Sequence, residues 1–257
     1  MNLPWPNEGQ GWMDVDGLGT MGDFGKQTPV AIGSVAKTMT AYIILRDHPL
    51  KPGQEGPKIK VDPTAEKEGG YNKSGESTLN TVKAGDSLTE KQALSAVMIP
   101  SANNIARLLA RWDAGSEAAF VKKMNATAKE LGMTGTTYTD PSGLKETTVS
   151  TAHDQVRLGR AVVKQPALVA ITSAASWTDP TGHNWPNYNS LPYWSARSAS
   201  RPAPPPRPAA TCCSPPARRS AGRRSPSSAR SSASTSPRSW TRSTRSARRR
   251  CWAPSTR

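Results

Sequence analysis

The chain has 257 residues and a formal net charge of +15, and all of that excess lies in its last quarter. Residues 1–195 hold 19 basic and 19 acidic residues, whereas residues 196–257 hold 15 Arg and no Lys, Asp or Glu. A positive charge confined to the last quarter does not indicate a nucleic-acid-binding surface on residues 1–195, the body of the chain. Because all three Cys lie in the same last quarter and no run of about 18 apolar residues occurs, composition excludes a disulfide-stabilised body and a membrane segment.

Extended segments are expected at several places in the body. Residues 11–18 and 28–32 have the pattern of N-terminal strands, and residues 58–61 and 77–82 of two further short ones. A polar, Gly-containing stretch separates the second pair.

The strand predicted at 28–32 runs directly into an amphipathic segment, and the junction carries a Ser-x-x-Lys motif. Ser34 lies at the start of the predicted helix, and Lys37 follows one turn later on the same face. A serine with a lysine base is a known acyl-transfer pair. About one such motif is expected by chance in a chain of this composition, and the plainer interpretation of Ser34 is a helix N-cap. Residues 142–145 repeat the pattern, but the Pro and Gly around them indicate a turn.

A second pair of polar residues lies between two predicted helices. A Thr-x-x-Gln capping box at residue 89 opens a helix that Pro100 ends, and another helix is predicted over residues 105–112. Ser101 and Asn103 therefore fall in the short link between them. Their plainer interpretation is again helix capping.

Two further amphipathic helices are predicted over residues 116–131 and 151–164. Helices around short strands favour an α/β architecture. No His or Cys spacing typical of a zinc site occurs, and Gly-x-Ser-x-Gly is missing, so neither a metal site nor a Ser-His-Asp hydrolase is expected.

Four segments together resemble the serine-type D-Ala-D-Ala carboxypeptidases, the low-molecular-weight penicillin-binding proteins. That family carries Ser-x-x-Lys, then Ser-x-Asn between two helices, then Lys-Thr-Gly on a strand. The resemblance covers roughly residues 10–195. It implies the penicillin-binding/serine β-lactamase-like transpeptidase fold, a helical cluster with a mostly antiparallel sheet. The segments are residues 34–41, 98–106, 138–144 and 188–191.

The resemblance also implies roles and partners. Ser34 would be the nucleophile, Lys37 its base, Ser101 a proton relay and Asn103 a hydrogen-bonding partner of the substrate backbone. The substrate would be a peptidoglycan stem peptide ending in D-Ala-D-Ala, and β-lactams would acylate the same serine. No cofactor, metal or nucleic acid is expected for the body. The family works outside the cytoplasmic membrane, so we expect an extracytoplasmic location and an export signal that this sequence does not include.

The third motif of the family is absent, and composition changes abruptly where it is due. Residues 196–257 are rich in Arg, Ser, Ala and Pro and hold no Ile, Val, Leu, Met or Phe. One interpretation is a genuine disordered tail that binds anionic surfaces. The other is translation out of frame: shifting the codons of residues 198–203 is compatible with apolar-Gly-apolar-Lys-Thr-Gly, and those of 204–215 with a Gly-rich turn and an apolar strand.

We therefore expect residues 1–195 to be a partial carboxypeptidase catalytic domain without its C-terminal strands. Residues 196–257 are expected to be a disordered tail read out of frame, with the frameshift near residues 194–198. The chain as written is expected to be inactive. Two alternatives stay open: a serine β-lactamase, which shares the first two motifs, and a non-catalytic protein that binds peptidoglycan or nucleic acid.

Overall fold

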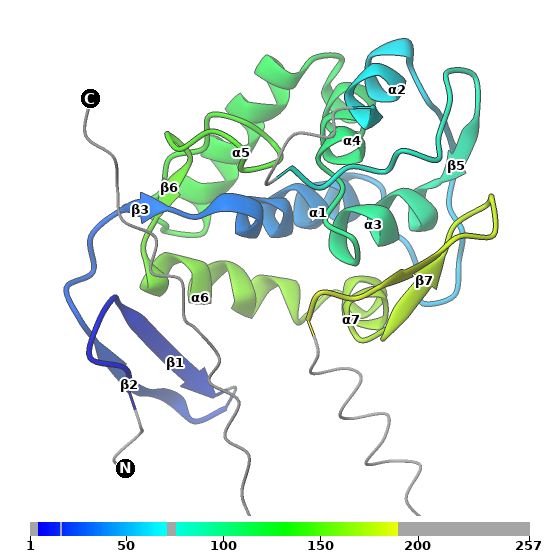
Figure 1. The fold of residues 1–257 in the computed structure, drawn as a ribbon. Helices are drawn as coiled ribbons and strands as arrows, with labels where there is room; N and C mark the ends of the chain where they lie inside the picture. The colour runs from blue at the N-terminus through cyan, green and yellow to red at the C-terminus, as the bar shows by residue number, and fades with distance from the viewer. Residues whose placement is uncertain (1–4, 16, 71–75, 190–257) are drawn as a thin grey trace, which may run out of the picture. The chain divides into compact units, whose positions relative to one another are not determined.

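The computed structural model describes residues 5–15, 17–70 and 76–189 (Figure 1). They belong to a unit that extends over Met1–Pro204. The predicted out-of-frame tail, residues 196–257, and the place where a third motif would fall lie outside the described residues.

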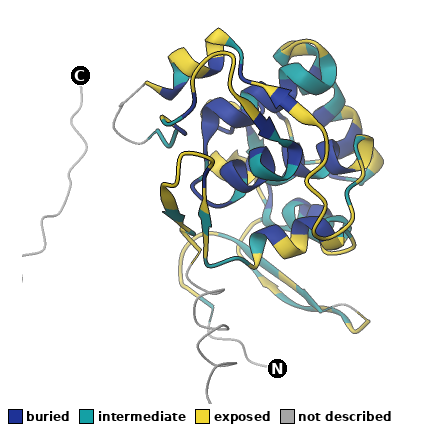
Figure 2. Ribbon diagram, turned by 90° about the vertical axis from the view of Figure 1, so that its right-hand side faces the viewer, coloured by how far each residue is buried: buried dark blue, intermediate teal, exposed yellow. Residues whose placement is uncertain are grey.

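Helix α1 (Ala36–Asp47) runs through the middle of the helical cluster, with helices packed on both of its sides (Figure 1). Eight of its residues are buried, Lys37 among them, so nearly every face of this helix is in the core. Buried residues gather in the interior of the helical cluster, and exposed ones lie on its outside (Figure 2). A helix enclosed in this way holds a side chain in a fixed place. The helices that contact α1 are α3 (Glu90–Met98), α4 (Asn103–Ala114), α5 (Glu117–Glu130), α6 (Ala152–Val162) and α7 (Pro166–Thr172).

Three of the predicted helix starts, those of α3, α5 and α6, are confirmed by their caps. Thr89 and Gln92 form the full capping box at the start of α3. Ser116 accepts a hydrogen bond from the Ala119 N–H at the start of α5, and Thr151 caps α6 in the same way. Each cap satisfies a backbone donor that the first turn leaves without a partner.

Within residues 5–15, 17–70 and 76–189, the strands form four two-stranded antiparallel pairs, and the N-terminal hairpin β1–β2 contacts α6. The strands expected at 11–18, 28–32 and 58–61 are confirmed as β1, β3 and β4. The strands β2, β5, β6, β7 and β8, and helices α2 (Pro63–Gly69) and α7, were not predicted. The pairs are β1 (Gly11–Val15) with β2 (Gly19–Phe24), β3 (Val30–Ala31) with β6 (Val149–Ser150), β4 (Lys58–Lys60) with β5 (Ser87–Thr89), and β7 (Ser176–Thr178) with β8 (Asn184–Pro186).

The strand predicted over residues 77–82 is wrong, because a buried side chain replaces the partner strand. Asn104 is fully buried; its Oδ1 accepts from the Leu79 N–H at 2.9 Å, and its Nδ2 donates to the Leu79 carbonyl at 3.0 Å. The Asn103 N–H donates to the Ser77 carbonyl at 2.8 Å. These bonds use the backbone groups that a strand ladder would need.

The second helix of the predicted pair begins two residues earlier than expected. Asn103 is the first residue of α4, so of the two candidate residues only Ser101 lies in the link. The helix begins here because Ser101 turns the chain in the left-handed region, with a φ of 61°, and Ala102 follows in an extended conformation. Within the described ranges, no helix is both long and apolar enough to cross a membrane.

Candidate active site

Ser34 and Lys37 lie together at the start of the central helix. Ser34 belongs to a 3₁₀ turn, Gly33–Val35, that leads directly into α1, and Lys37 is the second residue of that helix. Lys37 Nζ lies 2.9 Å from Ser34 Oγ. Ser34 is exposed while Lys37 is 2% exposed. An accessible hydroxyl is therefore hydrogen-bonded to a buried amine. Transfer of a proton from a nucleophile to its base requires such a direct contact.

Ser101 completes a group of three polar side chains. Its Oγ accepts a hydrogen bond from Lys37 Nζ at 3.2 Å. Among the described residues, Ser101 is the one non-glycine residue with a positive φ, at 61°. The left-handed region costs such a residue on the order of 1 kcal/mol, so the packing around it must enforce the conformation. The turn directs the hydroxyl from the α3–α4 link toward α1.

Asn103, the fourth predicted residue, faces a different partner. It is 4% exposed, and its Nδ2 donates to Glu76 Oε1 at 3.5 Å. A carboxylate can only accept, so this contact assigns the amide nitrogen to the Glu76 side and leaves Oδ1 as the acceptor on the other. An amide held in this way can accept a hydrogen bond from a substrate N–H.

Burial changes the protonation of the central amine. It lowers the pKa of Lys37 to about 8; Asp140 and Glu76 act against this shift, while the positive charge of Arg107 adds to it. At pH 7 about a tenth of such lysines carry no proton, compared with under one in a thousand at the usual pKa. Lys37 is therefore suited to act as a base near neutral pH.

Near Lys37 lie three charged residues, Glu76, Arg107 and Asp140, that were not singled out from the sequence as site residues. Arg107 lies one turn after Asn103 on α4; its Nη2 is 3.8 Å from Glu76 Oε1, and its Nη1 is 3.1 Å from Glu68 Oε1. The third, Asp140, lies in a loop whose Pro and Gly indicated only a turn. No short-range motif connects these residues to Ser34, because the fold brings them together from three distant segments.

The second Ser-x-x-Lys pattern, at residues 142–145, is a turn as expected. Ser142 is fully buried and its hydroxyl donates to Asp140 Oδ2 at 2.7 Å. Gly143 has a φ of 78°, and Lys145 is exposed. A buried hydroxyl with its proton committed to a carboxylate is not a nucleophile.

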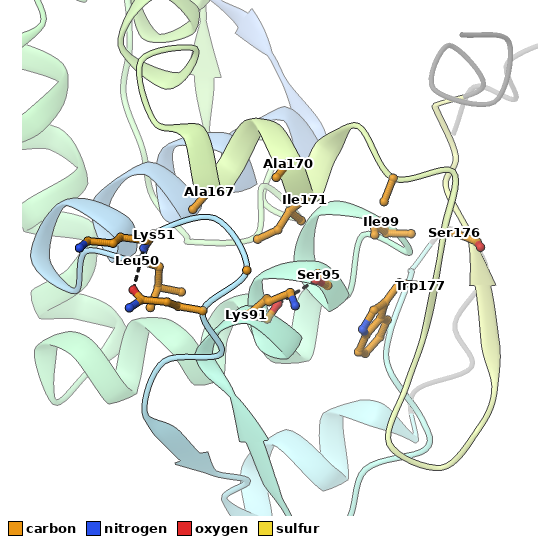
Figure 3. Close-up of a pocket in the computed structure, with 13 residues that line it drawn as sticks. Leu50, Lys51, Lys91, Ser95, Ile99, Ala167, Ala170, Ile171, Ser176 and Trp177 are labelled. Atoms are coloured by element: carbon orange, nitrogen blue, oxygen red, sulfur yellow. Dashed lines mark hydrogen bonds between the residues drawn. The ribbon is translucent and has the colours of Figure 1, made fainter. Parts of the chain in front are cut away.

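A separate cavity of about 170 Å³ lies between α3, α7 and the segment that follows α1 (Figure 3). Its walls are mostly apolar, and Ile99 and Trp177 lie at one end (Figure 3). None of the residues that line it belongs to the Ser34 group.

The arrangement of these helices and strand pairs is the penicillin-binding fold. Penicillin binding protein 6B from Escherichia coli matches with a TM-score of 0.65 and 25% identity, over 74% of this chain and 61% of that one. A D-alanyl-D-alanine carboxypeptidase from Mycobacterium tuberculosis matches with a TM-score of 0.61 and 27% identity, over 72% of this chain and 67% of that one.

Sequence comparison identifies the family within that fold. The profile of the peptidase S11 family, described as D-alanyl-D-alanine carboxypeptidase, matches residues 22–198. The chain belongs to this family of serine-type carboxypeptidases. The match ends beside the point where the composition of the chain changes.

Two relatives show how much of such a protein is present here. The D-alanyl-D-alanine endopeptidase of Escherichia coli K12 is 33% identical over 58% of this chain and 46% of its own length. The D-alanyl-D-alanine endopeptidase of Pseudomonas aeruginosa is 35% identical over 62% of this chain and 47% of its own length. The chain thus spans about half the length of these relatives.

Proposed function

We propose that the described body is the Ser34-bearing part of a serine D-Ala-D-Ala carboxypeptidase that acts on peptidoglycan stem peptides outside the cytoplasmic membrane. The observation that carries the proposal is the contact of one buried amine, Lys37 Nζ, with two hydroxyls, at 2.9 Å from Ser34 Oγ and 3.2 Å from Ser101 Oγ. Family membership supplies the substrate class.

The acylation step follows from this geometry. Ser34 Oγ attacks the carbonyl carbon of the penultimate D-Ala, and its proton moves to the lone pair of neutral Lys37 Nζ. The terminal D-Ala leaves as an amine after it gains a proton, for which Ser101 is the relay from Lys37. Water then hydrolyses the acyl-enzyme by the reverse sequence of proton transfers.

The remaining groups would orient the substrate and stabilise charge. Asn103 Oδ1 would accept from a backbone N–H of the stem peptide, since Glu76 occupies the other side of the amide. The Ser34 N–H, in the first turn before α1, would donate to the oxyanion. β-Lactams would react at the same serine, because they present a strained amide in the position of the D-Ala-D-Ala bond.

We further propose that the chain as written does not complete the reaction. The family uses a Lys-Thr-Gly strand for the substrate carboxylate and for the second oxyanion donor, and this triplet does not occur in the sequence. We define the frame-restored chain as the chain whose codons after residues 194–198 are read in the shifted frame. That form would supply the triplet.

The test is D-Ala release from diacetyl-Lys-D-Ala-D-Ala by both forms of the protein. We expect release by the frame-restored chain, its loss in Ser34→Ala, and none by the chain as written. Release by the chain as written would contradict the proposed need for the third motif. Rapid turnover of penicillin without D-Ala release would indicate a β-lactamase, and binding of peptidoglycan by the frame-restored chain with neither D-Ala release nor acylation by penicillin would indicate a non-catalytic protein.

A further inference from the structure

One buried carboxylate organises the loop over residues 140–148. Asp140 is 4% exposed. Its Oδ2 accepts from the Ser142 N–H at 3.2 Å, from the Ser142 hydroxyl at 2.7 Å and from the Leu144 N–H at 2.9 Å. Its Oδ1 accepts from the Thr148 hydroxyl at 2.6 Å. Four hydrogen bonds on two oxygens make this carboxylate the centre of the loop.

The loop contacts the chain on both sides of Ser34. Gly143 packs so closely that a Cβ added to it would overlap the Gly33 carbonyl oxygen, in the residue just before Ser34. On the other side, the buried Thr40 hydroxyl donates to the Pro141 carbonyl at 2.7 Å. The loop is therefore fixed against the turn that carries the nucleophile and against the next turn of α1.

Asp140 also carries a negative charge toward Lys37. Burial raises the pKa of Asp140, but the hydrogen bonds from Thr148, Ser142 and backbone N–H groups outweigh this and lower it, so the side chain is ionised at neutral pH. The charged groups that act on Lys37 are Asp140 from this loop, Arg107 from α4 and Glu76 from the segment before β5.

Asp140 differs from Glu76 in its partners. Glu76 is paired with Arg107 at 3.8 Å, which offsets its charge. Within the described part of the chain, no ion pair joins Asp140 to a cation, so its charge is balanced only by hydrogen-bond donors. Of the two carboxylates, Asp140 therefore has the larger uncompensated effect on the buried amine.

We propose that Asp140 is a positioning residue for the Ser34 reaction, one that fixes the 140–148 loop against the nucleophile turn and stabilises the ammonium formed on Lys37. In this step the proton leaves Ser34 Oγ as the bond from Oγ to the carbonyl carbon forms, and it binds the lone pair of Lys37 Nζ. Asp140 stays ionised and neither gains nor loses a proton. The role rests on the proposed function, because it assumes that Lys37 is the base.

The experiment is an NMR titration of Lys37 in the full chain, labelled with ¹³C at the lysine ε carbon. It compares wild type with Asp140→Asn and with the control variants Ser142→Ala and Thr148→Val. Asparagine keeps the shape: its oxygen can accept the three bonds made to Oδ2, and its amide can donate to the Thr148 hydroxyl. The controls each remove one of the same bonds but keep the charge.

We expect Asp140→Asn to lower the pKa of Lys37 below its wild-type value of about 8, and the two controls to leave it unchanged. An unchanged Lys37 titration in Asp140→Asn, or an equal shift in Thr148→Val, would overturn the proposal. Should Asp140→Asn fail to fold, the ¹³Cγ shift of Asp140 in wild type decides: an ionised carboxylate across the whole Lys37 titration supports the proposal, and a protonated one at pH 6 overturns it.

This readout is separate from catalysis. The Lys37 titration needs no substrate, so a failure of D-Ala release would contradict the proposed function without changing the NMR result. In the frame-restored chain, the kinetic counterpart is a shift of the rising limb of the acylation rate toward lower pH in Asp140→Asn, with a lower plateau. A plateau lowered without a shift would indicate a purely structural residue and overturn the charge role.

Discussion

Ser101 Oγ lies 3.2 Å from Lys37 Nζ, although the two residues are 64 positions apart and belong to different segments of the helical cluster. The contact depends on the left-handed conformation of Ser101 and on the burial of the Lys37 side chain. Lys37 is therefore the hydrogen-bonding partner of both the Ser34 and the Ser101 hydroxyl.

Replacing Lys37 by Met should lower the rate of Ser34 acylation in the frame-restored chain by about 10²- to 10⁴-fold, the usual contribution of a positioned base. In the frame-restored chain with Lys37 intact, the rate should rise with pH through an inflection near the Lys37 pKa of about 8, because only the neutral amine accepts the proton. Stopped-flow acylation by a chromogenic β-lactam between pH 6 and 10 measures both effects. A rate that falls through this range would show that the ammonium form is the reactive one.

Gly143→Ala should disturb the turn that carries Ser34, Gly33–Val35, whereas Gly182→Ala should not. Both glycines have positive φ, at 78° and 90°, so each alanine adds backbone strain of about 1 kcal/mol. At Gly143 the added Cβ would meet the Gly33 carbonyl oxygen, whereas at Gly182 no atom of the described residues lies within 4 Å of it.

In the frame-restored chain we expect acylation to fall about 100-fold or more in Gly143→Ala and to stay near wild type in Gly182→Ala, since small misplacements of a nucleophile are costly. Thermal unfolding of both variants separates this effect from loss of fold. Equal acylation rates would mean that the loop does not support Ser34.

Glu90→Leu should stabilise the protein. Glu90 is fully buried, neither carboxyl oxygen has a hydrogen-bond partner among the described residues, and burial raises its pKa to about 7. Removing an unsatisfied buried polar group is worth about 1–3 kcal/mol.

The gain should depend on pH in a defined direction. Because the folded-state pKa of Glu90 lies above the unfolded value of 4.5, the folded protein binds the proton more tightly, and wild type loses stability as pH rises between these values. Glu90→Gln should therefore remove the contribution of this residue to the pH dependence of stability. Denaturant unfolding at pH 5 and pH 8 measures both variants. A larger stability gain of Glu90→Leu at pH 5 than at pH 8 would contradict this explanation.

Asp179→Ala should loosen the β7–β8 hairpin. Burial raises the pKa of Asp179, but hydrogen bonds from Thr181, Trp185, Thr81 and the His183 N–H outweigh this and lower it well below its usual range. Thr81 Oγ1 and Trp185 Nε1 donate to the same oxygen, at 2.7 and 3.0 Å, and so connect the hairpin to the segment before β5.

A depressed carboxyl pKa gives stability that is present above the unfolded value and is lost as pH falls toward the folded value. Wild type should therefore lose stability below about pH 4, and Asp179→Ala should lose less over the same range. Tryptophan fluorescence during acid unfolding follows this, because Trp177 and Trp185 lie opposite each other in the hairpin. An equal loss of stability with falling pH in wild type and in Asp179→Ala would show that Asp179 does not cause this pH dependence.

Local patterns predicted the parts of the fold that depend on local chemistry. The Thr89 capping box, the N-caps Ser116 and Thr151, and the turn at Gly143 are all specified within four residues of sequence. The pairing of Ser34 with Lys37 is of the same kind, since one helical turn brings them together.

The wrong and missing predictions concern features that depend on contacts between distant residues. Residues 77–82 have a strand pattern, but the Asn104 side chain, 25 positions from Leu79, takes the backbone bonds that a strand would use. Asp140 and Arg107 act on Lys37 only because distant segments pack together, and the turn signals around Asp140 carry no information on that. The sequence pattern reveals caps and turns; the electrostatic surroundings of Lys37 require the tertiary structure.

The most direct test of the account is labelling with a fluorescent penicillin, followed by mass spectrometry of the modified peptide. It compares the chain as written, the frame-restored chain and the frame-restored Ser34→Ala variant. We expect a stable adduct on Ser34 in the frame-restored chain and in neither of the others. An adduct on another residue, or labelling that survives Ser34→Ala, would contradict the assignment of Ser34 as the nucleophile; equal labelling of the chain as written would contradict the need for a third motif.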